Sequence, residues 1–431
     1  MIMEYKEALD FLFSQLPMFS RSGAPAYKPG LDTSIALAGF FSNPHKKFKS
    51  IHIGGTNGKG STSHMLASVL QSQGYKVGLY TSPHLVDFRE RMRINGRMIP
   101  EAKVVEFINE WQESGYNGQP SFFELTMIMA FNWFAEEQVD YAVIEVGMGG
   151  RLDSTNIITP ILSVITNISH DHNQFLGETI EKIALEKAGI IKEGIPVVIG
   201  ETQKETEKVF KTQAKEKGSP VFFADQLNGV PNFTPIPFGW RCEWKDIYIN
   251  LPLGGDYQKK NIVTVFAALE ILKKHGIEIS KTAVKEGIEK VCHQTGLAGR
   301  WMILESNPLT IADTGHNIAG ITYNFHQLGN MMKEDSGRKL HVVIGFVADK
   351  AIEKILPLLP REAEYYITNA KIPRALPAEQ LYEKFREAGL KGTLHPTVEA
   401  AYIAAKEEAS QKDIIFIGGS TFIVADLLAS I

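Results

Sequence analysis

The chain has 431 residues, and 45 Lys and Arg against 49 Asp and Glu give it a formal net charge of −4. This near-balance lacks the excess of positive charge that is typical of nucleic-acid-binding proteins, so we expect no nucleic-acid partner. Hydrophobic residues make up 44% of the chain and aromatic residues 10%, which favours large buried cores and excludes the disordered class. At roughly 100–200 residues per domain, this length favours two or three domains.

The two cysteines, Cys242 and Cys292, lie far apart in the sequence and show no repeated spacing, which excludes a Cys-rich zinc site and a disulfide framework. The N-terminal residues lack the basic region and apolar core of a signal peptide. The stretch 154–170 has no charged residue, but it contains Pro160 and many polar side chains, so it does not resemble a membrane span. We therefore expect a cytoplasmic protein with no membrane partner.

Short apolar runs alternate with amphipathic stretches through the first half of the chain. This alternation is typical of βαβ units that form a mainly parallel sheet. The pattern predicts strands at 50–53, 76–80, 141–146, 162–166 and 196–199. It predicts helices at 61–73, 101–113, 123–137, 178–190 and 203–217.

The segment 220–253 interrupts this pattern with prolines, tryptophans and short alternating runs, which predict a small antiparallel appendage. Helical patterns return at 257–275 and 280–291, and the turn-rich segment 293–300 indicates a domain boundary. A second α/β series is then predicted, with strands at 309–312, 341–345, 364–367 and 414–418 and helices at 318–333, 349–359, 377–388 and 398–410.

We therefore predict an α/β protein of two domains. Residues 1–295 form a P-loop NTPase-like domain with a mainly parallel sheet and a small antiparallel appendage, and residues 296–431 form a smaller Rossmann-like α/β domain.

The strongest local motif is the glycine-rich run from Gly54 to Thr62, between the first predicted strand and its helix. Glycines allow consecutive backbone N–H groups to converge on phosphate oxygens, and the helix adds its positive N-terminal end. Lys59 supplies a cation, and the hydroxyl of Ser61 or Thr62 can approach Mg²⁺. The match to the standard phosphate loop is imperfect, because Gly60 stands where a hydroxyl is usual; the alternative is a glycine-rich turn with a solvated lysine.

The run 55–61, Gly-Thr-Asn-Gly-Lys-Gly-Ser, resembles the variant phosphate loop of the Mur ligase superfamily. More narrowly, the chain resembles the folylpolyglutamate synthase and dihydrofolate synthase family, and the supporting runs occur in the family's order. They are Tyr80–Leu85, Phe88–Arg91, Glu145–Asp153, Leu185–Gly189 and Asp313–Asn317.

The resemblance implies an ATP-dependent ligase that joins L-glutamate to dihydropteroate, to the glutamate tail of reduced folates, or to both. The acceptor carboxylate would become an acyl phosphate, with release of ADP and then phosphate. The resemblance implies Lys59, Lys187 and His316 as catalytic residues, with Lys187 carbamylated. It implies these ATP-binding residues: Gly55, Thr56, Asn57, Gly58, Lys59, Gly60, Ser61, Thr62, Asn261, Arg300 and Asp313.

Magnesium, as two ions, is implied with Ser82, Glu145 and His172 as ligands. Glu145 also suits this role from sequence alone, because it ends a predicted strand beside the phosphate loop, although a helix cap or surface ion pair is an alternative. His170 stands two residues before His172, but the Asp-His pair before Leu176 and Gly177 is the one the family carries.

Other residues implied by the resemblance also have ordinary explanations. Lys187 could be a solvated helix residue, Arg300 a linker ion pair, and Asn261 an ordinary residue of a helix N-terminus. The family's Asp-Gly-Ala-His-Asn motif here has Thr314 and Gly315 in its second and third places. The implied assembly of the ATP site from both domains depends on the resemblance.

Three rival functions agree less well with the sequence. A cell-wall Mur ligase is disfavoured, because only 53 residues precede Gly54, too few for a nucleotide-sugar domain. A non-catalytic nucleotide-binding regulatory protein would give no reason for Ser82, Glu145, His172 and Lys187 to accompany the loop. A dehydrogenase is disfavoured because Leu152 stands where the third glycine of a dinucleotide fingerprint belongs. The two self-contained domains favour a monomer.

Overall fold

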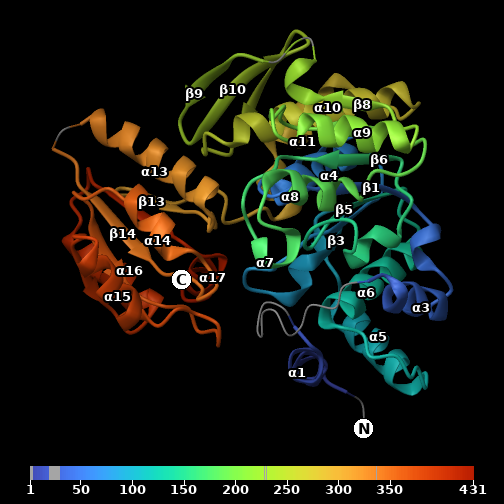
Figure 1. Ribbon diagram of the computed structural model, residues 1–431, viewed down its shortest axis with the longest axis horizontal. Helices are drawn as coiled ribbons and strands as arrows, with labels where there is room; N and C mark the ends of the chain where they lie inside the picture. The colour runs from blue at the N-terminus through green and yellow to red at the C-terminus, as the bar shows by residue number, and fades with distance from the viewer. Residues whose placement is uncertain (1–2, 19–29, 228, 230, 336) are drawn as a thin grey trace. The chain divides into compact units, whose positions relative to one another are not determined.

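The structure is a computed structural model that describes residues 3–18, 30–227, 229, 231–335 and 337–431. The chain divides into two compact units, coloured by chain position in Figure 1. Unit 1 comprises the chain up to Pro235, Arg241–Pro252 and Lys259–Leu297. Unit 2 comprises Ile236–Trp240, Leu253–Gln258 and Ala298–Ile431.

Unit 1 is organised around a sheet that has eight strands in the described part of the chain, in the order β4-β3-β2-β5-β1-β6-β7-β8. The pairs from β2 to β8 are parallel, whereas β2·β3 and β3·β4 are antiparallel. The strands are β1 (Lys49–Gly54), β2 (Val77–Tyr80), β3 (Met92–Ile94), β4 (Arg97–Met98), β5 (Tyr141–Glu145), β6 (Leu162–Ile165), β7 (Val197–Ile199) and β8 (Val221–Phe223).

Helices cover both faces of this sheet. They are α1 (Tyr5–Gln15), α3 (Asp32–Phe40), α4 (Lys59–Ser72), α5 (Glu101–Glu113), α6 (Phe122–Glu136), α7 (Asn173–Leu176), α8 (Ile180–Ala188), α9 (Glu207–Glu216), α10 (Gln258–Lys274), α11 (Lys281–Glu289) and α12 (Val291–Thr295). Ala142 and Ile144 of β5 pack into one core with α1, α3, α5 and α6, while α4 packs on β1, β2 and β5 and against α11.

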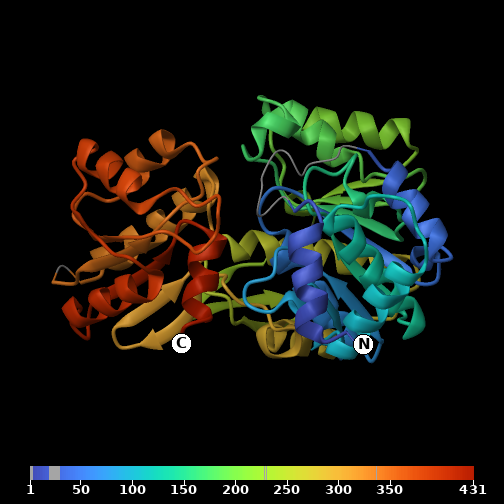
Figure 2. The same cartoon turned by 90° about the horizontal axis from the view of Figure 1, so that it is seen from below.

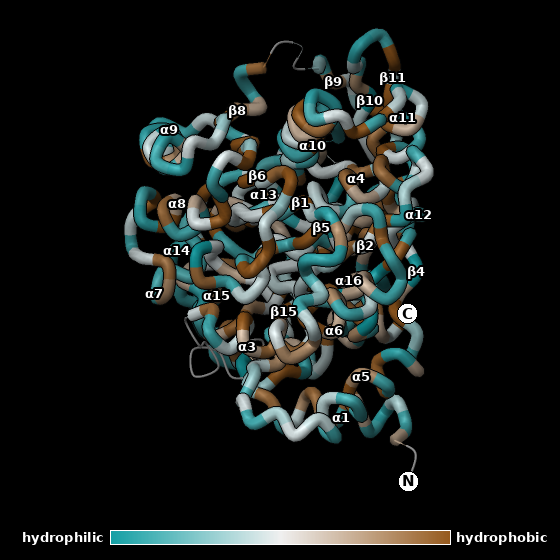
Figure 3. The backbone as a smooth tube through the Cα atoms, turned by 90° about the vertical axis from the view of Figure 1, so that its right-hand side faces the viewer, coloured by the Kyte–Doolittle hydropathy of each residue, from teal (hydrophilic) through white to brown (hydrophobic). Residues whose placement is uncertain are grey.

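The hydropathy of the strands and helices explains which of them are buried and which are exposed. The central strands β5 and β6 are buried along their whole length and predominantly hydrophobic, brown in Figure 3, whereas α9 is largely hydrophilic, teal in the same figure. Parallel strands with helices on both faces are expected to read as continuous apolar runs, which is why their positions could be predicted. No helix in the described ranges is long and apolar enough to cross a membrane.

A small sheet of β9 (Phe233–Ile236), β10 (Gly239–Trp244) and β11 (Ile247–Leu251) forms from the predicted appendage, in the order β11-β10-β9. The main sheet of unit 2 has, among the described residues, six strands in the order β12-β13-β17-β14-β15-β16. These are β12 (Met302–Ser306), β13 (Leu309–Ala312), β14 (Leu340–Ile344), β15 (Glu364–Ile367), β16 (Gly392–Leu394) and β17 (Ile414–Gly418).

In unit 2 only the β12–β13 hairpin (orange arrows in Figure 2) is antiparallel among the pairs of described strands. The helices are α13 (Ile318–Lys333), α14 (Ile352–Ile355), α15 (Ala378–Glu387), α16 (Val398–Glu408) and α17 (Thr421–Leu428). The predicted fold class is confirmed: a mainly parallel α/β unit, a small antiparallel sheet and a second α/β unit.

Two predicted helices are shorter than expected for identifiable reasons. The helix predicted at 203–217 begins at Glu207, because Thr202 bonds Asp225 and Gln203 bonds the backbone of Ile168. The helix predicted at 349–359 is only α14 followed by a 3₁₀ turn, Leu356–Leu358, that contains a proline.

Candidate active site

The phosphate loop joins the end of β1 at Gly54 to the start of α4 at Lys59. Two of its glycines have backbone angles that L side chains rarely adopt: φ is +131° at Gly55 and +84° at Gly58. A Cβ on Gly55 would lie 2.0 Å from Thr166 Oγ1, and one on Gly58 would lie 2.2 Å from Asn261 Oδ1. Asn261, near the start of α10, therefore lies directly against the loop.

Two lysines converge on one carbonyl oxygen of this loop. Lys59 Nζ donates to Gly55 O at 3.2 Å and to Thr56 O at 3.1 Å. Lys187, on α8, donates to the same Gly55 O at 2.9 Å. Lys187 is not the solvated helix residue that remained an alternative, because it is only 4% exposed. Burial, followed by the positive charge of Lys59, lowers the pKa of Lys187 to about 7.

Ser82 and Glu145 meet because β2 and β5 are neighbouring parallel strands, whose carboxyl ends lie at the same edge of the sheet. The Ser82 backbone N–H donates to Glu145 Oε2 at 3.0 Å, and Glu145 is 4% exposed. A buried carboxylate beside a serine residue, at a sheet edge next to a phosphate loop, fits a magnesium ion, which prefers oxygen ligands.

His172 follows β6, the neighbour of β1 on the side away from β5. It has φ +51°, precedes α7, and its backbone N–H donates to Asp171 Oδ1 at 3.0 Å. In the described ranges no three His, Cys, Asp or Glu residues gather as a metal site. The implied set contains two such residues and a serine, so an ion there needs water or phosphate oxygens to complete its octahedron. His170 Nδ1 lies 3.2 Å from Asn173 Nδ2, a local contact.

Unit 2 places Arg300, Asp313 and His316 around the carboxyl end of β13. Arg300 bonds the Thr314 hydroxyl and Gly299 O, and His316 Nδ1 lies 3.0 Å from Thr314 O. Thr314, one of the two departures from the family motif, therefore holds both side chains.

Asp313 is 2% exposed, and partners from its own unit surround its carboxylate. Oδ2 accepts from the Tyr257 hydroxyl and from Trp301 N, and Oδ1 accepts from Gly315 N and from Asn324 Nδ2. Burial and the Asp313 charge raise the pKa of Tyr257 well above its usual value, so the phenol stays a donor. Asp313 thereby fixes the local structure around the predicted site.

Sequence reasoning assigned no role to Asp153, which lies in the loop after β5 and is 7% exposed. It accepts from Met148 N at 2.8 Å and from Thr155 N at 3.0 Å, and burial raises its pKa. His52 Nε2 lies 2.9 Å from the Thr155 hydroxyl, and burial lowers the pKa of His52 to about 3, so the imidazole is neutral. The available signal was an acidic residue a few positions beyond a strand end.

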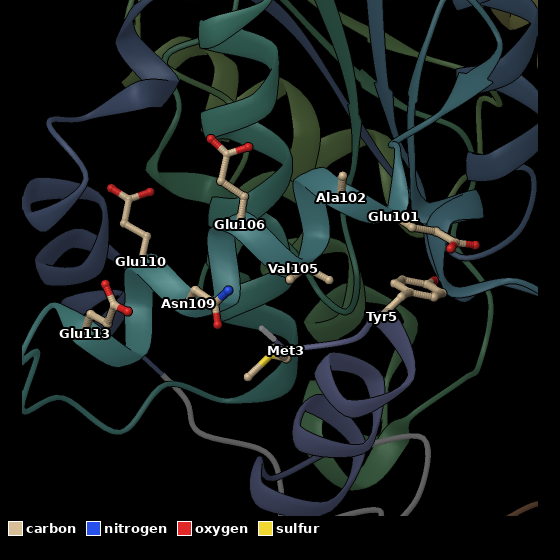
Figure 4. Close-up of a pocket in the computed structure, with 9 residues that line it drawn as sticks. All are labelled: Met3, Tyr5, Glu101, Ala102, Val105, Glu106, Asn109, Glu110 and Glu113. Carbon is tan, nitrogen blue, oxygen red and sulfur yellow. The ribbon is translucent and has the colours of Figure 1, made fainter. Parts of the chain in front are cut away.

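A groove of about 690 Å³ lies between the start of α1 and the outer side of α5 (Figure 4). Its lining is apolar near Met3, Tyr5 and Val105 and acidic along the rest of α5. None of the residues implied as site residues lines it, so this groove is separate from the candidate active site.

Comparisons with known proteins agree with this geometry. A model of the Mur ligase middle domain matches residues 53–269, and a model of the Mur ligase glutamate ligase domain matches residues 299–421. The dihydrofolate synthase/folylpolyglutamate synthase of Bacillus subtilis is 34% identical over 415 residues, which cover 93% of this chain and 94% of that protein.

Solved structures resemble the whole chain. The Escherichia coli enzyme FolC, in complex with DHPP and ADP, superposes with a TM-score of 0.84 at 30% identity, covering 99% of this chain and 97% of that one. The bifunctional folylpolyglutamate synthase/dihydrofolate synthase of Yersinia pestis, complexed with AMPPNP and Mn, gives a TM-score of 0.83 at 28% identity, covering 99% and 98%.

Proposed function

Because the chain belongs to the dihydrofolate synthase/folylpolyglutamate synthase family of Mur ligases, we propose that it is an ATP-dependent glutamate ligase. It joins L-glutamate to dihydropteroate and to the glutamate tail of reduced folates, forming ADP and phosphate. The observation that carries the proposal is the phosphate loop, where Lys59 and Lys187 share Gly55 O. The relatives supply the substrate class, since the Escherichia coli structure holds DHPP and ADP.

The reaction begins when the acceptor carboxylate attacks the γ phosphorus of ATP in line with the departing ADP. Backbone N–H groups of the loop, the N-terminal end of α4 and Lys59 stabilise charge on the phosphate oxygens. The product is an acyl phosphate, whose carbonyl carbon the amine of glutamate then attacks. The amide forms as phosphate leaves and the attacking nitrogen loses its proton.

We assign His316 a role with that nitrogen. Its Nδ1 donates to Thr314 O, which places the proton on Nδ1 and makes Nε2 the basic atom of the ring. Nε2 accepts the proton that the amine loses. Arg300 and Asp313, with Asn261 of unit 1, are proposed as nucleotide residues, Asp313 by fixing the position of its neighbours.

Ser82, Glu145 and His172 are proposed to hold magnesium, and the Yersinia pestis relative supports a divalent ion through its complex with AMPPNP and Mn. When bound, the ion neutralises phosphate charge. The buried Lys187 amine, with a pKa of about 7, suits reaction with CO₂ to give a carbamate. We propose that this carbamate organises a second ion.

The test is ADP formation by the purified chain with ATP, Mg²⁺, L-glutamate and either dihydropteroate or tetrahydrofolate. ADP with tetrahydrofolate alone would remove the dihydropteroate half of the proposal. ATP binding without ADP or amide from either acceptor would instead favour a regulatory nucleotide-binding protein. A Lys59→Ala variant should lose turnover with both acceptors, and the exposed Lys47, replaced by Ala, is the matched control.

Three further expectations remain predictions. The division into functional domains at 295/296 can be tested by limited proteolysis, and the monomer by light scattering. The cytoplasmic location can be tested by fractionation of the source cells.

A further inference from the structure

The segment that follows β6 lies along the phosphate loop and is hydrogen-bonded to it at Thr166, Asn167 and Ser169. Asn167 makes the densest set of these bonds. Its side-chain Oδ1 accepts from Asn57 N at 3.1 Å, its Nδ2 donates to Asn57 O at 3.0 Å, and its carbonyl accepts from Thr56 N at 2.8 Å. One residue thus holds the backbone of two consecutive loop residues.

Residues near Asn167 make further hydrogen bonds to the same part of the loop. The Thr166 hydroxyl donates to Asn57 O at 2.6 Å, so that this carbonyl accepts two hydrogen bonds. The Ser169 backbone N–H donates to the Thr56 hydroxyl at 3.0 Å. These contacts define one orientation of the peptide group between Asn57 and Gly58.

This orientation matters because the C=O and N–H of a trans peptide point in opposite directions. With the Asn57 carbonyl directed at Asn167 and Thr166, the Gly58 N–H is directed away from them. Gly58 has φ +84° and no Cβ, so its own chain offers little resistance to rotation of this peptide. The fixed orientation must therefore come from outside the loop.

We propose that Asn167 is a positioning residue that keeps the Asn57–Gly58 peptide turned so that the Gly58 N–H faces the phosphates of the bound nucleotide. The proposal rests on the proposed ATP-dependent function and deepens it. Asn167 acts through the loop backbone and need not touch the nucleotide. Rotation of this peptide would present a carbonyl oxygen to the phosphate, which repels it, in place of a donor.

Gln203 provides a matched control, which tests whether Asn167 has only a structural role. Gln203 binds Ile168 in the same way, with Oε1 accepting from Ile168 N and Nε2 donating to Ile168 O, each at 2.8 Å. It holds the same segment, one residue further along, but has neither bond to the loop backbone that Asn167 has. Removing either side chain deletes two amide hydrogen bonds from one segment.

The experiment compares Asn167→Ala, Asn167→Asp and Gln203→Ala with the unmodified chain. The readouts are the Kd for Mg·ADP by calorimetry, KM for ATP and for glutamate, and Tm without ligand. Asn167→Ala should raise the ADP Kd and the KM for ATP about tenfold, which corresponds to about 1.4 kcal/mol, and leave the KM for glutamate within about twofold.

Asn167→Asp should be the more damaging variant. Its carboxylate still accepts from the Asn57 N–H but repels the Asn57 carbonyl, and so favours the rotated peptide. Gln203→Ala should lower Tm while its ADP Kd stays within about twofold of the unmodified value. Thr166→Val keeps the side-chain shape and should weaken ADP binding about threefold. It replaces Asn167→Ala as the test variant if Asn167→Ala does not fold.

Unchanged ADP binding in Asn167→Ala, or in Thr166→Val if that variant is needed, would overturn the proposal. An equal loss in Gln203→Ala would also overturn it, since the effect would then be general loosening of the segment. ADP binding can be measured in a chain that forms no product. A failed ligase assay would therefore refute the proposed function while the binding comparison still decides the role of Asn167.

Discussion

Replacing Lys187 by Met should change how the stability of the chain depends on pH. Lys187 is 4% exposed, and its Nζ shares Gly55 O with Lys59. Burial and then the Lys59 charge lower its pKa from 10.5 to about 7. An amine that is neutral in the folded chain but protonated in the unfolded chain makes folding release a proton, and this release links stability to pH.

The sign follows from the two pKa values. Between pH 7 and 10.5 the unfolded chain binds more protons at this site, so stability rises with pH by about 1.4 kcal/mol per pH unit. The destabilisation is complete below about pH 7, where it amounts to about 5 kcal/mol at most, and it disappears as pH passes 10.5. The Lys187→Met variant has no titratable group at this position, so it lacks this pH-dependent destabilisation at every pH.

The assay is urea unfolding of both proteins at pH 7 and 9 in buffers freed of CO₂. The stability advantage of Lys187→Met should shrink by about 2 kcal/mol between pH 7 and 9, because the amine is still half protonated in the folded chain at pH 7. Lys182→Met, at an exposed position of the same helix, should follow the unmodified chain. Parallel pH profiles for the unmodified chain and Lys187→Met would refute the assignment of a neutral, buried amine. Added bicarbonate should stabilise only chains that retain Lys187, because the carbamate needs that amine.

Three other substitutions test the site. Gly58→Ala, whose Cβ would lie 2.2 Å from Asn261 Oδ1 at φ +84°, should weaken ADP binding at least about tenfold by calorimetry; unchanged binding would contradict the loop geometry. Glu145→Gln keeps an acceptor for Ser82 N–H but removes the charge, so the Mg²⁺ concentration for half-maximal activity should rise about tenfold with unchanged Tm. Asp313→Asn replaces acceptor positions by an NH₂ group, so thermal and urea unfolding should show a loss of about 2–4 kcal/mol; unaltered unfolding would show that these bonds are dispensable.

The central strands could be predicted from sequence because they are buried on both faces. Residues 141–146 and 162–166 are mostly apolar, although they include Glu145 and Ser163, and β5 and β6 fall within them. The phosphate loop was predictable for a related reason, since its glycines and lysine are adjacent in the chain. A sequence pattern is enough to predict an element when the residues that determine its structure are adjacent in the chain.

Other features depend on contacts between residues that are distant in sequence. Residues 253–258 belong to unit 2 although their neighbours on both sides belong to unit 1, and the Tyr257–Asp313 hydrogen bond joins positions 56 residues apart. The bond from Lys187 to Gly55 spans 132 residues. Periodicity cannot report such pairs, so the burial of Lys187 and the role of Asn167 emerge only once the strand order is known.

The net charge of −4 is a poor guide to anion binding by this chain. The relevant charge is local and belongs to two lysines that share one carbonyl oxygen of the loop. Lys59 and Lys187 both donate to Gly55 O, and two full positive charges so close together repel one another. Burial lowers the pKa of Lys187 to about 7, so Lys187 loses its proton near this pH and the repulsion decreases. Lys59 is then the residue that we propose to contact the phosphates. Conversion of the neutral Lys187 amine to a carbamate would place a negative charge at this position and so attract a metal ion. The shape of the loop depends on Gly55, Gly58 and their neighbours, whereas its charge, on the proposed carbamylation of Lys187, would depend on pH and on CO₂.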